Sequence, residues 1–305
     1  METVADLHEV PCPLCGGHDV VAVLRDTTAR RIATAATVAC TSRDHARFGQ
    51  IVACRACGIR FRSPREDDET ILSYYSAVED PVYVEQEAAR RLTFDRALVE
   101  LEARVPIRGP LLDVGCYTGV FLDVAAARGW DVRGIEPSRW AAGVAIGKGH
   151  RVHHGTLERA PDGFRDFAVI TMWDTLEHYA DPVRELRRAR AVAARGGYLV
   201  LSTMNVDSAV ARLLGRRWPW YMRMHLAYFT PRTVRTALAA AGWEMVDRSR
   251  YAHVVSWDYL LLKLGAYLPA AARGLRATAR RFRSGDRTIS VDLGDFMTVY
   301  ARATA

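Results

Sequence analysis

Lysine is nearly absent from this sequence: Lys148 and Lys263 are the only two, so the formal net charge of +7 rests on arginine. The arginines are scattered along an alanine-rich chain, and only 273–283 holds a dense basic cluster. A protein that grips nucleic acid usually carries a basic stripe interleaved with aromatic residues. We therefore interpret the charge as compositional bias and expect no nucleic-acid partner.

Long uncharged apolar runs are missing as well. The most apolar region, 253–275, is interrupted by Asp258, Lys263, Pro269 and Arg273. A membrane span of about 20 residues would not tolerate these interruptions, so none is expected. The first ten residues include acids and lack the apolar core of a secretory signal, which predicts a cytoplasmic protein.

The remaining composition is that of a folded globular chain. Hydrophobic residues make up 50% and charged residues 25% of the 305 residues, a balance unlike that of disordered proteins. This length suffices for one large core with appendages or for two domains of ordinary size. Six cysteines in a reducing compartment indicate a metal site rather than disulfides.

Two copies of a Cys-x-x-Cys-Gly motif, CPLCGG and CRACGI, stand near the N-terminus. The two-residue spacer lets both thiolates of a motif reach one ion, and the glycine can adopt the left-handed conformation that such a turn needs. Four thiolates suit tetrahedral zinc and leave no open coordination position. We therefore expect a structural Zn²⁺ site made by Cys12, Cys15, Cys54 and Cys57.

The two motifs are separated by 16–53, a longer insertion than a compact zinc ribbon has. Loop closure becomes only slowly less favourable with length, so the insertion is tolerable. Cys40 and His45 lie inside it without a partner at ligand spacing. Whether either residue joins the metal site stays open.

The chain beyond the second motif divides into a helical part and an alternating part. Helical patterns at 67–75 and 84–105 indicate a connection, in which Tyr74, Tyr75 and Tyr83 either close over a site or pack the helices. From 109 onward apolar strands alternate with helices, the pattern of a parallel sheet covered on both faces. We predict a zinc-knuckle domain at 1–66, a helical connection at 67–108 and a Rossmann-like α/β domain at 109–305.

Within the last part, strands are predicted to end at Asp113 and Glu136, to begin near 151, and to run over 167–173, 198–203, 243–251 and 295–303. Helices are predicted up to Arg128 and over 182–194, with a turn at Gly196–Gly197. Ser138 and Thr230 are positioned to cap helices, and the helix after Thr230 should end at Gly242.

The stretch LLDVGCYTGVF, 111–121, has the pattern of a strand, a tight turn and a helix start. A dinucleotide fingerprint, G-x-G-x-x-G, would need glycines where Tyr117 and Val120 stand, because the pyrophosphate lies against the backbone there. A dinucleotide is therefore not expected. S-adenosylmethionine has no pyrophosphate, and a side chain that points away from the turn is compatible with it.

Five stretches in order, LLDVGCYTG, GIEPS, FAVITMWDTLEH, GGYLVLST and DFMTVYARA, resemble class I S-adenosylmethionine-dependent methyltransferases. They are similar to the branch with ubiquinone-biosynthesis O-methyltransferase-like enzymes, and the resemblance covers 109 to 305. The cysteine motifs and the tyrosine-containing connection are similar to those of zinc-containing deoxysugar C-methyltransferases. Tyr117 departs from the usual glycine.

The resemblance implies a seven-stranded Rossmann-like sheet, S-adenosyl-L-methionine as cofactor, and a small-molecule or carrier-linked acceptor. A nucleotide-linked deoxysugar or a glycan or secondary-metabolite precursor is the first expectation, methylated on carbon or oxygen. The resemblance also implies the roles of the cofactor-site residues. Asp113, Gly115 and Gly119 would shape the methionine pocket beside Tyr117, and Glu136 would hold the ribose. Thr156 and Leu157 would flank the adenine, and Trp173 and Asp174 would complete the cofactor site. The alternative for Glu136 is a solvated strand end.

The end of the fourth strand, WDTLEH, also carries the candidate chemistry. The protein must align the acceptor and, where needed, remove its proton. His178 is the first candidate base because imidazole titrates near neutral pH, with Glu177 and Asp174 as carboxylates that orient it or polarise the acceptor. His225 is the second candidate, because similar enzymes have a histidine there. Helix capping for His178 and core packing for His225 are the alternatives.

Two aromatic or basic segments accompany these candidates. Trp218, Trp220, Tyr221, Tyr228 and Phe229 either shield an acceptor from water or pack the interior. The insertion at 254–286 is expected to form a helical lid or interface whose arginines bind phosphate, with peripheral membrane contact as the alternative.

Two other functions stay open at this point. One is an RNA methyltransferase that grips nucleic acid with its cysteine motifs, and the other is a non-catalytic interaction protein whose Tyr117 closes the pocket. The sequence does not indicate the oligomeric state or which histidine takes the proton.

Overall fold

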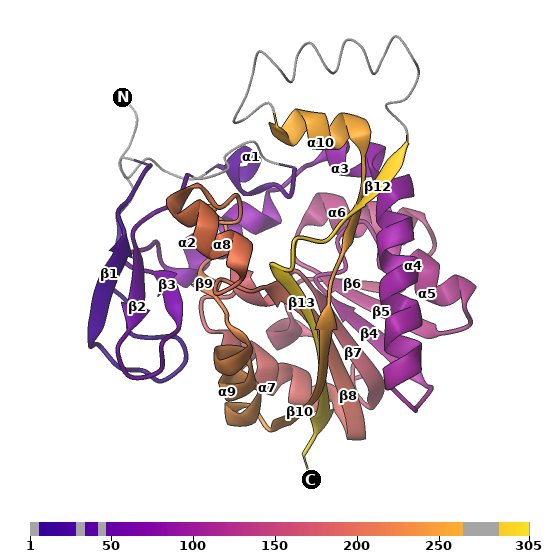
Figure 1. Cartoon of the computed structure of the whole chain (residues 1–305). Helices are drawn as coiled ribbons and strands as arrows, with labels where there is room; N and C mark the ends of the chain where they lie inside the picture. The colour runs from indigo at the N-terminus through magenta and orange to yellow at the C-terminus, as the bar shows by residue number, and fades with distance from the viewer. Residues whose placement is uncertain (1–5, 29–33, 42–46, 265–286, 305) are drawn as a thin grey trace.

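The computed structural model describes residues 6–28, 34–41, 47–264 and 287–304. Figure 1 shows a small β-sheet built mainly from the N-terminal part of the chain, beside a larger sheet flanked by helices. Among the described residues, no helix combines the length and the apolar character that crossing a membrane would need.

The small sheet is antiparallel, in the order β1 (Val20–Leu24), β2 (Ile51–Cys54), β3 (Arg60–Arg62) and β9 (Ala227–Tyr228). Its fourth strand therefore comes from the second half of the chain. The insertion between the cysteine motifs supplies a short helix, α1 (Ala35–Val38). The cysteine motifs are thus joined to the large domain by strand pairing as well as by the chain.

The stretch expected to be helical contains three helices: α2 (Asp68–Ser76), α3 (Pro81–Glu85) and α4 (Glu87–Arg104). The Asp67 and Asp80 side chains accept hydrogen bonds from the first turns of α2 and α3, which satisfies backbone donors that lack a partner inside the helix. One helix predicted over 84–105 is instead divided at Gln86, which lies between α3 and α4.

The large sheet has seven strands, as expected, in the order β10-β13-β8-β7-β4-β5-β6. The central strands β5, β4, β7 and β8 run parallel with β6, and β13 is antiparallel to both β8 and β10. The strands are β4 (Pro110–Val114), β5 (Asp131–Glu136), β6 (Val152–His154), β7 (Phe167–Trp173), β8 (Ala193–Met204), β10 (Trp243–Arg250) and β13 (Phe296–Ala303).

Helices cover both faces of this sheet, with α4 and α5 on one side and α7 and α9 on the other (Figure 1). The predicted caps are confirmed: the Ser138 side chain accepts from Ala141 N at the start of α6, and Thr230 accepts from Thr233 N at the start of α9. The helices are α5 (Val120–Ala127), α6 (Arg139–Gly147), α7 (Pro182–Val192), α8 (Ala209–Leu214) and α9 (Pro231–Ala240).

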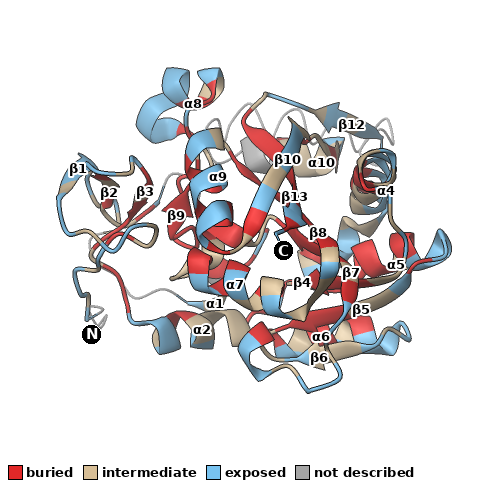
Figure 2. Cartoon of the chain, turned by 90° about the horizontal axis from the view of Figure 1, so that it is seen from below, coloured by how far each residue is buried: buried red, intermediate tan, exposed pale blue. Residues whose placement is uncertain are grey.

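Alternation along the strands divides the core between the two faces, and the buried residues follow the middle of the sheet (Figure 2). On β4, Leu111 belongs to the cluster with α4 and α5, whereas its neighbour Leu112 belongs to the cluster with α7 and α9. Successive side chains of a strand point to opposite faces, which explains the division. The second cluster also contains Cys12 and Phe61, so the cysteine motifs share the hydrophobic core of the large domain.

Two regions differ in detail from the predictions. The turn expected at Gly196–Gly197 lies inside β8, where the pairing with β7 is irregular; a side chain at Gly197 would come within 2.9 Å of Ala194 O. The insertion at 254–286 contains the end of β11 (His253–Ser256), which pairs with β12 (Thr288–Val291). Helix α10 (Trp257–Leu264) follows β11, and the arginine cluster at 273–283 lies outside the described residues.

The strand order places the site. The chain winds outward from β4 in one direction through β5 and β6, and in the other direction through β7 and β8. In open α/β sheets, ligands bind at the carboxyl ends of the strands where the order reverses. This point lies between the end of β4, followed by Gly115, and the end of β7, followed by Asp174.

Candidate active site

The turn after β4 needs glycine at both ends. Gly115 and Gly119 have φ angles of 78° and 77°, and a Cβ on Gly115 would lie 2.9 Å from the Thr175 side chain. Tyr117, in the middle of the turn, has a φ of 49°. A left-handed conformation in a bulky residue costs roughly 1–2 kcal/mol, so other contacts must hold Tyr117 in place.

The Tyr117 ring packs on Tyr83 of α3 and on Trp140 of α6, with ring centroids 4.4 and 6.1 Å away. Within the described part of the chain its hydroxyl group is buried and has no hydrogen-bond partner. The ring therefore joins the connection helices to the glycine turn.

Glu136 ends β5 with a carboxylate that is only 4% exposed. One oxygen accepts from Tyr117 N at 2.9 Å and the other from Ser138 N at 2.7 Å. Burial raises its pKa to about 7, although the two backbone donors act in the opposite direction. The expectation of a solvated strand end is wrong, since the carboxylate is buried beside the turn.

The remaining residues expected around the cofactor are gathered at the same ends of the strands. Asp113 is buried and accepts from Thr171 Oγ1 at 2.6 Å, and burial, together with the nearby Glu136, raises its pKa to about 7. Gly155 N donates to Glu136 O at 2.9 Å. Thr156 and the buried Leu157 follow Gly155 in the chain, so they come directly after a contact with the end of β5. Trp173 ends β7.

These residues fit S-adenosylmethionine by their chemistry. Besides Tyr117 Oη, two buried polar atoms of the described residues lack a hydrogen-bond partner here, Thr118 Oγ1 and Trp173 Nε1. Buried polar groups normally have a partner, and a ligand with a carboxylate and hydroxyl groups can supply it. Glu136 provides a fixed acceptor, and Gly115 leaves the space that a Cβ would fill.

The three predicted catalytic residues lie together. Glu177, His178 and His225 each present one side-chain nitrogen or oxygen atom, and these atoms all lie within 4.8 Å of one another. The two imidazole rings are 4.9 Å apart between centroids. Leu226 N donates to Glu177 O at 2.8 Å, which holds the two segments together.

Hydrogen bonds orient both rings. His225 Nδ1 lies 2.7 Å from Trp220 O, and His178 Nδ1 lies 3.1 Å from Met224 O. A carbonyl oxygen only accepts, so Nδ1 carries the proton in each ring and Nε2 is the basic nitrogen. The Tyr75 hydroxyl group lies 2.8 Å from both His178 Nδ1 and Met224 O. Tyr75 of the connection therefore contacts the candidate base.

The Glu177 carboxyl group is 1% exposed, and one of its oxygens accepts from Thr203 Oγ1 at 2.9 Å. Burial, with the charge of Asp174 as the second cause, raises its pKa to about 8. Burial also lowers the pKa of His178. At neutral pH the pair therefore consists of a protonated carboxyl group and an uncharged imidazole.

Most of the aromatic residues predicted either to shield an acceptor or to pack the interior are buried in the structure. Trp220 is the half-buried exception. The others are buried: Trp218, Tyr221, Tyr228 and Phe229.

His253 is a site residue that was not predicted from the sequence. It begins β11, and its Nε2 lies 3.1 Å from Asp174 Oδ2. Asp174 has a φ of 49°, a strained conformation of the kind that gathers at functional sites. The only signal in the sequence is a histidine at the start of an apolar stretch.

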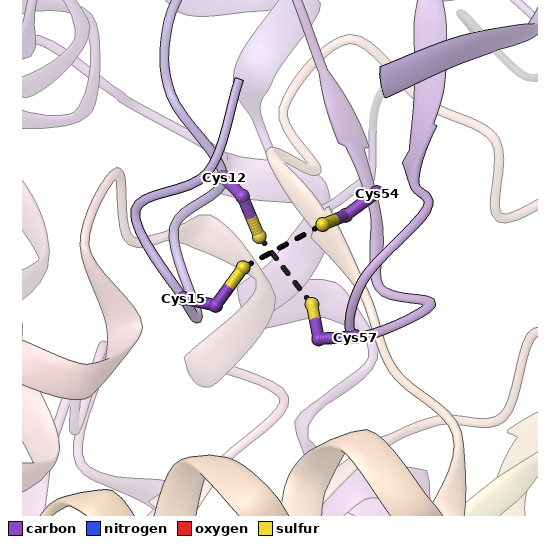
Figure 3. Close-up of side chains that lie close together, drawn as sticks. All are labelled: Cys12, Cys15, Cys54 and Cys57. Carbon is purple, nitrogen blue, oxygen red and sulfur yellow. Dashed lines mark hydrogen bonds between the residues drawn. The ribbon is translucent and has the colours of Figure 1, made fainter. Parts of the chain in front are cut away.

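The four cysteines of the two motifs point at a common centre (Figure 3). The sulfur atoms of Cys12 and Cys57 are 3.4 Å apart, and those of Cys15 and Cys54 are 3.5 Å apart. A tetrahedral zinc ion with bonds of about 2.3 Å separates its sulfur ligands by about 3.8 Å. The sulfur atoms would therefore have to move slightly apart to admit the ion. Cys40 is exposed and does not belong to the group, and His45 lies outside the described residues.

The strand order, the glycine turn after β4 and the acid that ends β5 together define a class I S-adenosylmethionine-dependent methyltransferase. Residues 85–248 match the family described as "Methyltransferase domain". The chain belongs to this family.

Similar proteins include two ubiquinone biosynthesis O-methyltransferases. The one from Azorhizobium caulinodans is 30% identical over 158 residues, which cover 47% of this chain and 62% of that protein. The one from Cereibacter sphaeroides is 28% identical over 196 residues, covering 59% and 76%. A methyltransferase structure from Thermotoga maritima covers 71% of this chain and 90% of its own, with a TM-score of 0.48 and 19% identity.

Proposed function

We propose that this protein transfers the methyl group of S-adenosylmethionine to a hydroxyl group of a small or carrier-linked acceptor. The observation that carries the proposal is the convergence of Glu177, His178 and His225 beyond the carboxyl end of β7. Glu177 lies two residues after Thr175, the residue that faces Gly115. Oxygen is preferred over carbon as the methylated atom because relatives from two genera are O-methyltransferases by name.

The cofactor supplies the methyl group on a positively charged sulfur, a good leaving group. In this proposal Glu136 holds the ribose, while Asp113, Gly115 and Gly119 shape the space for the methionine end. Other expected contacts come from Tyr117, Thr156, Leu157 and Trp173.

The buried cluster binds the acceptor and orients its hydroxyl group. His178, whose pKa is lowered by burial, and His225 present Nε2 atoms that can accept a hydrogen bond from a hydroxyl group, and protonated Glu177 can donate one. Tyr75 fixes the ring of His178.

We further propose that Cys12, Cys15, Cys54 and Cys57 hold a structural zinc ion in a module of residues 1–66, linked by 67–108 to the catalytic domain of 109–305. Strand β9, which closely follows His225 in the chain, pairs with β3 of the small sheet. The metal would therefore stabilise the sheet that holds the segment with His225.

The test is formation of S-adenosylhomocysteine from a panel of acceptors by the zinc-loaded protein. The panel holds nucleotide-linked deoxysugars, hydroxylated aromatic compounds and, for the alternative, transfer RNA. A small hydroxylated acceptor should turn over, and its product should carry the methyl group on oxygen. Turnover of RNA alone would overturn the proposal, as would a protein that binds the cofactor and methylates carbon only.

The variants His178→Ala and His225→Ala separate the two histidines on that acceptor. Misalignment of the acceptor hydroxyl group lowers kcat, whereas loss of an acceptor contact mainly raises KM. We expect the larger loss of kcat for His178→Ala and a larger KM for His225→Ala.

A further inference from the structure

A second carboxylate–imidazole pair borders the site. His253 Nε2 lies 3.1 Å from Asp174 Oδ2, and the two side chains are 25% and 34% exposed. Glu177 and His225, in contrast, are 1% and 5% exposed. His253 and Asp174 are therefore accessible from solvent, whereas Glu177 and His225 are not.

Asp174 is held rigidly at the end of β7. Ser202 Oγ donates to Asp174 Oδ1 at 2.5 Å and accepts from Asp174 N at 2.8 Å. Burial acts to raise its pKa, but His253, Ser202 and His178 together lower it. The carboxylate is therefore ionised at neutral pH and only accepts hydrogen bonds.

This arrangement determines the tautomer of His253. Since Asp174 Oδ2 can only accept, Nε2 carries a proton, and Nδ1 is the ring nitrogen left to exchange a proton with an acceptor. A carboxylate that holds one imidazole nitrogen fixes the ring orientation and stabilises the charge that forms when the other nitrogen takes a proton.

Aromatic side chains fix the His253 ring on several sides. Trp220 stacks on it, with centroids 6.3 Å apart and planes at 25°, and Phe296 contacts it edge-on at 4.6 Å. Asp295 accepts from Trp220 Nε1 at 3.0 Å and so holds the stacking partner. Trp220 O is also the acceptor for His225 Nδ1, so Trp220 contacts both histidines.

We propose that His253 is a further catalytic residue, whose Nδ1 takes the proton of the acceptor hydroxyl group, and that Asp174 is its positioning residue. The inference rests on the proposed function. The acceptor O–H bond breaks and its proton moves to Nδ1, while the oxygen forms a bond to the methyl carbon. The bond from that carbon to sulfur breaks with its electron pair left on sulfur, which gives S-adenosylhomocysteine.

The role given to Asp174 differs from the cofactor contact that the resemblance implies. In this account its two oxygens accept from Ser202 and His253, and the carboxylate positions His253 rather than the cofactor. Replacement of His253 should then impair turnover without impairing cofactor binding.

The first arm of the test measures kcat of full-length, zinc-loaded His253→Gln on the acceptor that the panel identifies. We expect kcat to fall about 100-fold or more, with the dissociation constant of S-adenosylhomocysteine changed less than about threefold. The matched control is His8→Gln, which removes an exposed histidine 3.9 Å from Asp6 and should leave kcat unchanged. Wild-type kcat in folded His253→Gln, with turnover lost in His178→Ala, would overturn the inference while leaving the proposed function intact.

The second arm needs no acceptor. Nitrogen-15 NMR of histidine-labelled protein bound to S-adenosylhomocysteine reports which ring nitrogen carries the proton, and His253→Gln identifies the His253 signals. We expect the Nε2–H form in the wild type and a mixture of tautomers in Asp174→Asn, as a positioning role for Asp174 requires. A wild-type His253 protonated on Nδ1 alone would overturn the inference. Failure of the wild type to bind the cofactor would instead count against the proposed function.

Discussion

Tyr117 donates its backbone N–H to the buried carboxylate of Glu136, with 2.9 Å between the nitrogen and the oxygen. The contact joins the turn after β4 to the end of β5 through the backbone of residue 117. Its side chain is not needed for this bond, so a tyrosine can stand in the turn as long as its ring packs elsewhere. Tyr83 and Trp140 provide that packing.

The buried hydroxyl group of Tyr117 leads to a prediction about stability. Because it has no partner among the described residues, Tyr117→Phe should stabilise the cofactor-free protein by about 1 kcal/mol. Thermal unfolding without ligand measures this change. A destabilised variant would show that the hydroxyl group is already paired, for example by water.

Gly115 should tolerate no side chain. In Gly115→Ala the new Cβ would lie 2.9 Å from Thr175, and φ is 78°. We expect a loss of about 2 kcal/mol in the free energy of unfolding and weaker cofactor binding. The control is Gly163→Ala, where no atom lies within 4 Å of the added Cβ. Equal stability of the two variants would contradict the prediction.

Zinc content should depend on the four clustered cysteines and not on Cys40. Cys12→Ser should reduce bound zinc well below one ion per chain, whereas Cys40→Ser should leave it at one, since Cys40 is exposed and outside the group. A tetrahedral site that loses a thiolate binds zinc far less tightly. Metal analysis of the purified variants measures the number of zinc ions per chain. Zinc that persists in Cys12→Ser would contradict the assignment.

The raised pKa of Glu177 predicts how stability varies with pH. Its carboxyl group has an ordinary pKa of 4.5 and a pKa of about 8 in the folded protein, so the protonated form favours folding. Below pH 4.5 the protonated carboxyl group makes its full contribution to the free energy of unfolding. The contribution is lost as the pH rises to about 8, and it amounts to roughly 1.4 kcal/mol for each unit between the two pKa values.

Comparison with Glu177→Gln isolates the effect from other groups, including His178, whose lowered pKa acts in the opposite direction near neutral pH. Denaturant unfolding between pH 4.5 and pH 8 should show a smaller decline in stability for the variant. Parallel curves for the two proteins would contradict the prediction.

Much of the sheet could be predicted from the sequence because local patterns determine it. The strand 131–136 and the caps at Ser138 and Thr230 were predicted where the structure has them. The two glycines of the expected turn lie inside β8, between Ala193 and Tyr198, where the register with β7 shifts.

The candidate site was predictable only in part. Glu177 and His178 follow a strand in one short motif, so their place at the sheet edge follows from the motif. The pairing of His253 with Asp174 joins residues 79 positions apart, and the β11–β12 ribbon that carries His253 has no distinctive pattern. Likewise, no local signal indicates that Tyr75 contacts His178 across 103 positions.

The most direct test of the central claim is calorimetric titration of the zinc-loaded protein with S-adenosylmethionine and S-adenosylhomocysteine, with NAD as the control. The account predicts that both sulfur compounds bind, that NAD does not, and that Glu136→Ala abolishes the binding. A folded wild-type protein that binds neither sulfur compound would contradict it and favour a non-catalytic protein whose Tyr117 closes the pocket.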